Sequence, residues 1–142
     1  DLDPLIRYRK HGVDEKRRIL AQLYRQVEEL TQQKKIIEEQ VEKETALAKE
    51  EGSVEASAFL GNYLQGARRK IRSIEKAIHE MNTRIVVAQE DMRNAFSEMK
   101  KVEITQRRRQ EKEKKERDGK ESRELDEVAI ENYRRRLDED NI

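Results

Sequence analysis

The side chains best suited to acid–base or metal chemistry in this chain are its two histidines, His11 and His79. They lie far apart in the sequence, and the absence of cysteine excludes disulfides and thiolate metal sites. A catalytic or metal-binding histidine needs an orienting partner and a cleft, which neither position offers. The five glycines are scattered and form no phosphate-binding loop. We therefore expect a protein that is not an enzyme, with no catalytic residue, metal ion or cofactor.

The run Arg107, Arg108 and Arg109 could be a solvated helix face, a contact with an acidic protein surface, or a contact with nucleic acid. Interleaved acidic residues weaken the positive field, and no aromatic side chain lies among the arginines to stack on bases. The whole chain has 32 basic and 31 acidic residues, whereas nucleic-acid binders usually have a basic excess. We therefore expect a solvated face or a protein contact, and no nucleic-acid partner.

Two aromatic residues, Phe59 and Tyr63, lie off the apolar seam that is described next. They either cap one end of the molecule or form an exposed anchor for a partner, because aromatic side chains are favoured at binding hot spots. Leu47 and Ala77 are expected to flank the same end and to join that surface.

A long helix must position these side chains, because apolar residues recur at alternating spacings of four and three from residue 60 to residue 102. A period of about 3.5 residues gives a helix a narrow apolar seam that must be buried against another helix. The seam consists of Leu60, Leu64, Ala67, Ile71, Ile74, Ile78, Met81, Ile85, Ala88, Met92, Ala95, Met99 and Val102.

A second, weaker seam precedes it over residues 2–48. The charged residues that interrupt this seam are Arg9, Lys16, Lys34 and Glu44. Its helix is expected to start at Asp3 and Pro4, with Asp3 as the N-cap. Gly52 and Ser53 form the best breakpoint, because glycine suits a left-handed C-terminal cap and serine can cap the next helix.

These patterns predict an all-α fold, a long antiparallel two-helix coiled coil whose second helix extends beyond the first. The expected parts are a helix over 4–51, a turn at 52–53, a paired second helix over 54–104 and a charged helical extension over 105–142. A short turn favours pairing within one chain, so the protein is expected to be a monomer by itself.

Two registers remain open for this hairpin. In the favoured register Leu23 faces Ile85, whereas a looser turn would shift the pairing by one heptad, so that Leu23 faces Met92.

The extension divides into two segments of opposite charge. Residues 104–120 have eight basic and four acidic side chains, a net of +4, and residues 121–142 have four basic and eight acidic, a net of −4. High helix propensity and many pairs of opposite charge predict a solvated single helix that could kink at Gly119. A short amphipathic patch closes it with Leu125, Val128, Ala129, Tyr133 and Leu137. This patch is too small to fold alone, so we expect it to dock on a partner or to fray.

Composition disfavours globular, membrane-spanning and secreted proteins. Charged residues make up 44% of the chain and aromatic residues 4%, which disfavours a thick globular core. The longest run of strong hydrophobes, residues 85–88, is too short to cross a membrane, and no signal peptide is visible. A cytoplasmic or peripherally membrane-associated protein is expected.

Three stretches of the chain, taken in order, form a recognisable combination. The first is residues 5–18, LIRYRKHGVDEKRR, which is followed by the seam at Leu20 and Leu23. The second joins residues 101–103 to the arginines at 107–109, and the third joins residues 124–129 to residues 133–135. Together they resemble the flagellar export protein family FliJ. The resemblance covers nearly the whole chain and implies a hairpin similar to the central stalk of rotary ATPases.

The resemblance also implies a function, a non-catalytic coupling component of the bacterial flagellar type III protein export apparatus. Its implied partners are the hexameric export ATPase, the cytoplasmic part of the export gate in the inner membrane, and export chaperones. Insertion into the ATPase ring would involve Leu5, Ile6, Arg7, Arg9, Arg107, Arg108 and Arg109. Contact with the gate or chaperones would involve Leu47, Phe59, Tyr63 and Ala77. The alternative is a structural coiled-coil scaffold or arm without an ATPase partner, which predicts dimers or larger assemblies.

Overall fold

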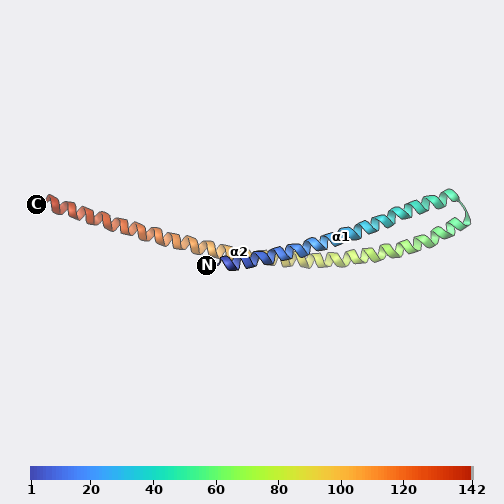
Figure 1. Cartoon of the computed structure of the whole chain (residues 1–142), viewed down its shortest axis with the longest axis horizontal. Helices are drawn as coiled ribbons and strands as arrows, with labels where there is room; N and C mark the ends of the chain where they lie inside the picture. Colours follow the sequence, from blue (N-terminus) through green and yellow to red (C-terminus); the bar gives the residue numbers. More distant parts are fainter. Residues whose placement is uncertain (142) are drawn as a thin grey trace.

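The computed structural model describes residues 1–141, which form two long helices packed against each other (Figure 1). Helix α1 spans Asp3–Glu51 and helix α2 spans Val54–Asp140. The helices lie side by side and antiparallel, and α2 continues well past the N-terminus of α1 (Figure 1). The prediction of an all-α hairpin with a longer second helix is therefore confirmed.

The turn between the helices consists of Gly52 and Ser53. Gly52 has a φ of 67°, and its N–H donates to the carbonyl of Ala48 at 3.0 Å. Glycine suits this left-handed conformation because it has no Cβ to clash with the backbone. The Ser53 hydroxyl accepts a hydrogen bond from the N–H of Ala56 at 3.0 Å and so caps α2. Two residues are therefore enough to reverse the chain.

The start of α1 differs from the prediction. The N-cap is Leu2, without a side-chain capping bond, and Asp3 is already helical. The carboxylate of Asp3 instead accepts a hydrogen bond from Gln106 Nε2 of α2 at 2.7 Å, and Asp1 Oδ1 accepts from the N–H of Asp3 at 3.0 Å. The local sequence correctly indicates that a helix starts here. It cannot reveal that the Asp3 carboxylate, the expected capping group, bonds to Gln106 of α2 instead of to the first turn of α1.

The two seams form the core of the hairpin. Every seam position named above is buried or half-buried on both helices, including the charged positions in α1. A cluster of buried side chains joins Leu20 of α1 to Ile85 and Ala88 of α2. Since buried apolar area is the main stabilising term, this cluster is expected to carry much of the hairpin's stability.

Lys34 is the charged seam residue nearest the middle of α1. Its Nζ lies 3.1 Å from Glu75 Oε1 on α2 and 3.8 Å from Glu38 Oε1 on its own helix. The hydrogen bond to Glu75, together with the negative charge of that carboxylate, raises the pKa of Lys34. In the favoured register Lys34 faces Ile74, next to Glu75. In the register shifted by one heptad, Lys34 would face Met81, which lies about 9 Å from Glu75 along the helix axis. The ion pair between Lys34 and Glu75 therefore supports the favoured register.

The extension of α2 beyond the hairpin, residues 107–140, is helical and exposed at every position. The helix continues without interruption through Gly119, the position where the sequence suggested a kink.

We expect Gly119→Ala to stabilise this extension, because glycine in a helix interior costs about 0.5–1 kcal/mol relative to alanine. A Cβ at Gly119 meets no atom within 4 Å, so the substitution adds no clash. Hydrogen exchange of the neighbouring amides should slow accordingly. Lys120→Ala serves as the control, because it replaces one good helix former with another. Faster exchange in Gly119→Ala would contradict an uninterrupted helix.

Candidate functional site

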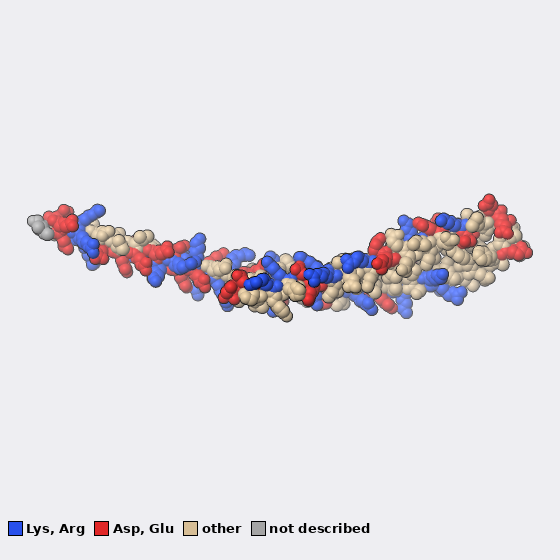
Figure 2. All heavy atoms as spheres, in the orientation of Figure 1, with Lys and Arg blue, Asp and Glu red and all other residues tan. Residues whose placement is uncertain are grey.

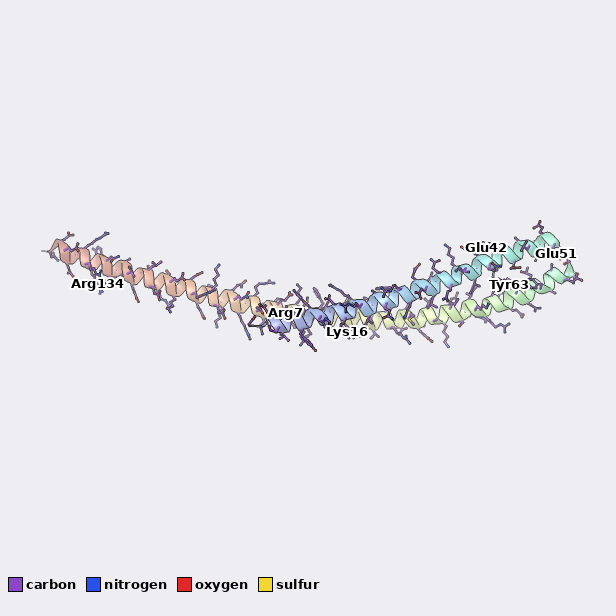
Figure 3. All side chains as sticks on the ribbon, in the orientation of Figure 1. Arg7, Lys16, Glu42, Glu51, Tyr63 and Arg134 are labelled. Atoms are coloured by element: carbon purple, nitrogen blue, oxygen red, sulfur yellow. The ribbon has the colours of Figure 1, made fainter. Side chains whose placement is uncertain are left out.

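The hairpin presents a candidate contact surface at each of its ends. We call the end where α1 starts the base surface, and the end at the turn the tip surface. Figure 3 labels Arg7 at the base and Glu51 and Tyr63 near the tip. The residues of the base surface are Leu5, Ile6, Arg7, Arg9, Arg107, Arg108 and Arg109.

At the base, the start of α1 lies against the part of α2 that enters the extension (Figure 1). The hydrogen bond between Asp3 and Gln106 joins the two helices there. Leu5 is 40% exposed, whereas Ile6 and Arg9 are half-buried because they lie on the seam. The structure thus brings the seven residues predicted for the ATPase ring to one end of the hairpin.

The arginines at 107–109 form a positive collar around a single helix. All three are exposed, and within residues 1–141 none of them forms an ion pair with a carboxylate. Consecutive residues are about 100° apart around a helix, so the three guanidinium groups point to different sides. Such a collar suits a partner that encloses the helix better than one that covers a single face.

Two polar atoms at the base are buried without a hydrogen-bond partner in the described part of the chain, Arg9 Nε and Gln106 Oε1. Buried polar groups in folded proteins are nearly always paired with protein or with ordered water. Arg9 Nε and Gln106 Oε1 are therefore expected to bind ordered water or a partner.

The tip surface is built around an open hollow of about 610 Å³. Leu47 of α1 and Phe59 of α2 both line it, and they are 58% and 59% exposed. The other lining residues are Glu44, Ala48, Glu50, Glu51, Glu55 and Ala56. Four carboxylates therefore surround an apolar floor, and Figure 2 shows uncharged atoms over the tip half of the hairpin with acidic atoms at its very end.

Tyr63 extends this apolar surface toward the middle of the hairpin. Its ring stacks on that of Phe59, with centroids 6.2 Å apart. Tyr63 also lines a second hollow of about 380 Å³, together with Ile36, which is 63% exposed. Sequence reasoning missed Ile36, although its place directly beside the seam residue Ile37 was a signal of a wider apolar stripe.

Ala77 does not join the tip surface, contrary to the expectation that it flanks the same end. It is half-buried and lies about 21 Å beyond Tyr63 along α2. In an antiparallel hairpin, nearness to the tip depends on distance from the turn, and Ala77 lies some seven helical turns after Gly52.

The histidines lie apart, as their sequence positions indicate. His11 Nε2 lies 3.1 Å from Glu15 Oε1 on the same exposed helix face, and His79 is exposed on α2. Within residues 1–141 no group of three or more His, Cys, Asp or Glu side chains could hold a metal ion. No helix in this part of the chain is long and apolar enough to cross a membrane.

A helical hairpin with a basic collar at one end and an acidic, apolar hollow at the other defines a class of protein, an antiparallel coiled-coil rod. The chain belongs to the family described as flagellar FliJ protein, whose family model matches residues 1–138. The resemblance read from the three sequence stretches is thus confirmed, and the chain is a component of flagellar protein export. No curated protein and no solved structure matches it.

Proposed function

We propose that this chain is the non-catalytic central stalk of the flagellar type III export ATPase, acting in the cytoplasm at the inner-membrane export apparatus. The observation that carries the proposal is the collar of arginines around a single helix, which form no ion pair within residues 1–141 and lie directly beside the paired base of the hairpin. A positive collar fits a partner whose acidic groups surround it, as the opening of a hexameric ring would.

Exposed charge contacts also suit a part that turns or shifts within a ring. Each exposed ion pair contributes only about 0–1 kcal/mol, so one set of contacts can exchange for another without a deep energy minimum. The apolar seam, by contrast, packs the two helices of the hairpin against each other and keeps the rod stiff.

The tip surface is the proposed contact for the export gate or for export chaperones. Leu47 and Phe59 offer exposed apolar area, which soluble proteins usually cover or use in binding, and the half-buried ring of Tyr63 stacks on Phe59. The paired part of the rod is about 70 Å long, so a partner at the tip and a ring at the base can be bound together. This separation would let the rod couple the ATPase to the gate.

The proposal is tested with the purified chain and the export ATPase from the same cell. We expect the two to co-purify, and we expect the chain to increase the rate of ATP hydrolysis. By itself the chain should sediment as an elongated monomer. Failure to bind the ATPase, together with dimers or larger assemblies in sedimentation, would favour the scaffold alternative instead.

We expect Phe59→Ser to weaken binding of the chain to the cytoplasmic part of the export gate by about tenfold or more, because truncating an aromatic hot-spot residue costs about 2 kcal/mol or more. Phe96→Ser is the matched control, since Phe96 is also exposed, at 41%, but lies away from the tip. Isothermal titration of both variants measures the difference. Stimulation of the ATPase should be unchanged in both, and equal gate affinities would remove the tip from the proposal.

A further inference from the structure

The apolar seam by itself permits a second register of the hairpin. In the observed register Leu23 packs against the cluster that contains Ile85, and after a shift of one heptad it would face Met92. Every α1 seam position from Val13 to Ala48 would then again face an apolar residue of α2. A seam that repeats every seven residues does not distinguish two registers that differ by one heptad. Polar contacts between the helices must make that choice.

Three polar contacts between α1 and α2 select the observed register. They join Asp3 to Gln106 at 2.7 Å, Tyr24 to Gln89 at 2.8 Å and Lys34 to Glu75 at 3.1 Å. A shift of one heptad would move the members of each pair about 10 Å apart along the axis and break all three contacts. The observed register is therefore the more stable one.

The two buried polar atoms at the base that lack a partner fit the shifted register instead. Arg9 Nε carries a hydrogen and Gln106 Oε1 accepts one, and neither has a hydrogen-bond partner within residues 1–141. In the observed register Arg9 faces Met99, whereas in the shifted register it would face Gln106, seven residues farther along α2. A donor and an acceptor that are unsatisfied in one register would thus pair in the other.

The start of α2 supplies the chain length that the shift needs. In the shifted register Glu51 would lie level with Leu64, so residues 52–63 would connect the two helices. The weak helix formers in this segment are Gly52, Ser53, Ser57, Gly61 and Asn62. A longer connection costs little, because the entropy of loop closure grows only slowly with length. An equal shift in the opposite direction would instead unwind residues 45–51, which are mostly strong helix formers, and would give Arg9 no partner.

We propose that the hairpin exchanges between the observed register and a minor register, shifted by one heptad, in which Arg9 Nε donates a hydrogen bond to Gln106 Oε1. The exchange links the two ends of the rod. The first turns of α2 unwind at the tip, and the start of α1 moves about 10 Å along α2 at the base.

The shift would change the surroundings of the arginine collar. In the observed register the collar lies past the start of α1 (Figure 1). In the shifted register Ile6, which now faces Val102, would face Arg109, so α1 would cover one side of the collar. The register would then control binding of the ATPase to the collar. This consequence rests on the proposed function, whereas the two registers themselves do not.

Disulfide trapping in the full chain tests the second register, because the chain has no cysteine of its own. Ile37→Cys is combined with Ile71→Cys for the observed register, with Ile78→Cys for the shifted register, or with Leu64→Cys for the opposite shift. All four are half-buried seam residues, so the three variants are matched. A disulfide needs Cα atoms within about 7 Å, which a pair one heptad out of register does not offer.

Under mild oxidation we expect the Ile71 variant to form its intramolecular disulfide fastest, which also shows that the introduced cysteines leave the hairpin folded. The Ile78 variant should form its disulfide more slowly, but at least about tenfold faster than the Leu64 variant. Equal rates for the Ile78 and Leu64 variants would overturn the inference and leave the proposed function in place.

Arg9→Leu tests the hydrogen bond that stabilises the minor register. Leucine packs on Met99 in the observed register but would face the polar Gln106 in the shifted one, so disulfide formation in the Ile78 variant should slow about tenfold. Lys16→Leu is the matched control, because Lys16 faces a methionine in both registers. Equal slowing by both substitutions would contradict the pairing of Arg9 with Gln106.

The oxidised variants connect the register to the collar. Locked in the shifted register, the Ile78 variant should bind the export ATPase at least about tenfold more weakly than the Ile71 variant, which should bind as the unchanged chain does. Equal binding by the two locked variants would overturn the control of the collar by the register. Failure of the unchanged chain to bind the ATPase would overturn the proposed function, while the trapping rates would still decide whether the second register exists.

Discussion

Replacing Arg107, Arg108 and Arg109 with glutamate is expected to abolish stimulation of the export ATPase and to weaken binding by about 100-fold at low salt. The three arginines are exposed and have no carboxylate partner within residues 1–141, so their charge is available to a binding partner. Each reversal replaces an attraction with a repulsion, at a cost of about 1 kcal/mol, and three such changes cost about 3 kcal/mol. The loss should shrink as ionic strength rises, because salt screens exposed charges. Titration of ATPase activity against chain concentration at two salt levels measures the effect.

The hairpin offers a matched control in Arg68, Arg69 and Lys70. These residues are also consecutive, basic and exposed, but they lie toward the tip. Their replacement with glutamate changes the net charge by the same amount and should leave ATPase stimulation nearly intact. Equal losses in both triple variants would mean that only net charge matters, and the collar would lose its assigned role.

The second large effect is expected for Leu20→Ala, which should lower the free energy of unfolding by about 2–5 kcal/mol. Leu20 is 8% exposed and packs in the cluster with Ile85 and Ala88. Removing its methyl groups loses buried apolar area and leaves a cavity between the two helices. Because domains of this size are stable by only about 5–15 kcal/mol, much of the hairpin's stability is at stake. Denaturant unfolding followed by circular dichroism measures the change.

Ile19→Ala provides the control for this measurement. Ile19 is the neighbour of Leu20 in sequence but is 48% exposed, since it lies off the seam. Ile19→Ala should lower the free energy of unfolding by less than about 1 kcal/mol, as surface substitutions usually do. Comparable losses at the two positions would show that the seam does not form the hairpin core.

Most of the fold could be predicted because one repeating spacing determines it. The apolar series from residue 60 to residue 102 requires a partner helix, and the glycine and serine at 52–53 place the reversal. Even the charged seam residues Lys34 and Arg9 are half-buried, since the spacing, not the residue type, decides which face meets the partner. What the sequence left open was the register, which the structure shows in the packing of Leu20 against Ile85 and Ala88 and in the contact between Lys34 and Glu75.

The candidate site was predicted less completely. The base residues came from the family resemblance, and their proximity follows directly from antiparallel pairing. The tip was harder, because a hollow depends on how two helices diverge and on side chains from both. Leu47 and Phe59 were named, but Ile36 and the acidic rim were not, and Ala77 was assigned to the wrong place. Gln106 could have been predicted as a contact between the two helices at the base, because it follows Val102 at the four-residue spacing of the seam.

The most direct test of the stalk proposal is the stoichiometry of the complex with the assembled ATPase hexamer, measured by mass photometry over a range of chain concentrations. A stalk on the axis of the ring predicts saturation at one chain per hexamer, because a second rod cannot occupy the same opening. Saturation at six chains per hexamer would place the chain on the outside of each subunit and would contradict the proposal.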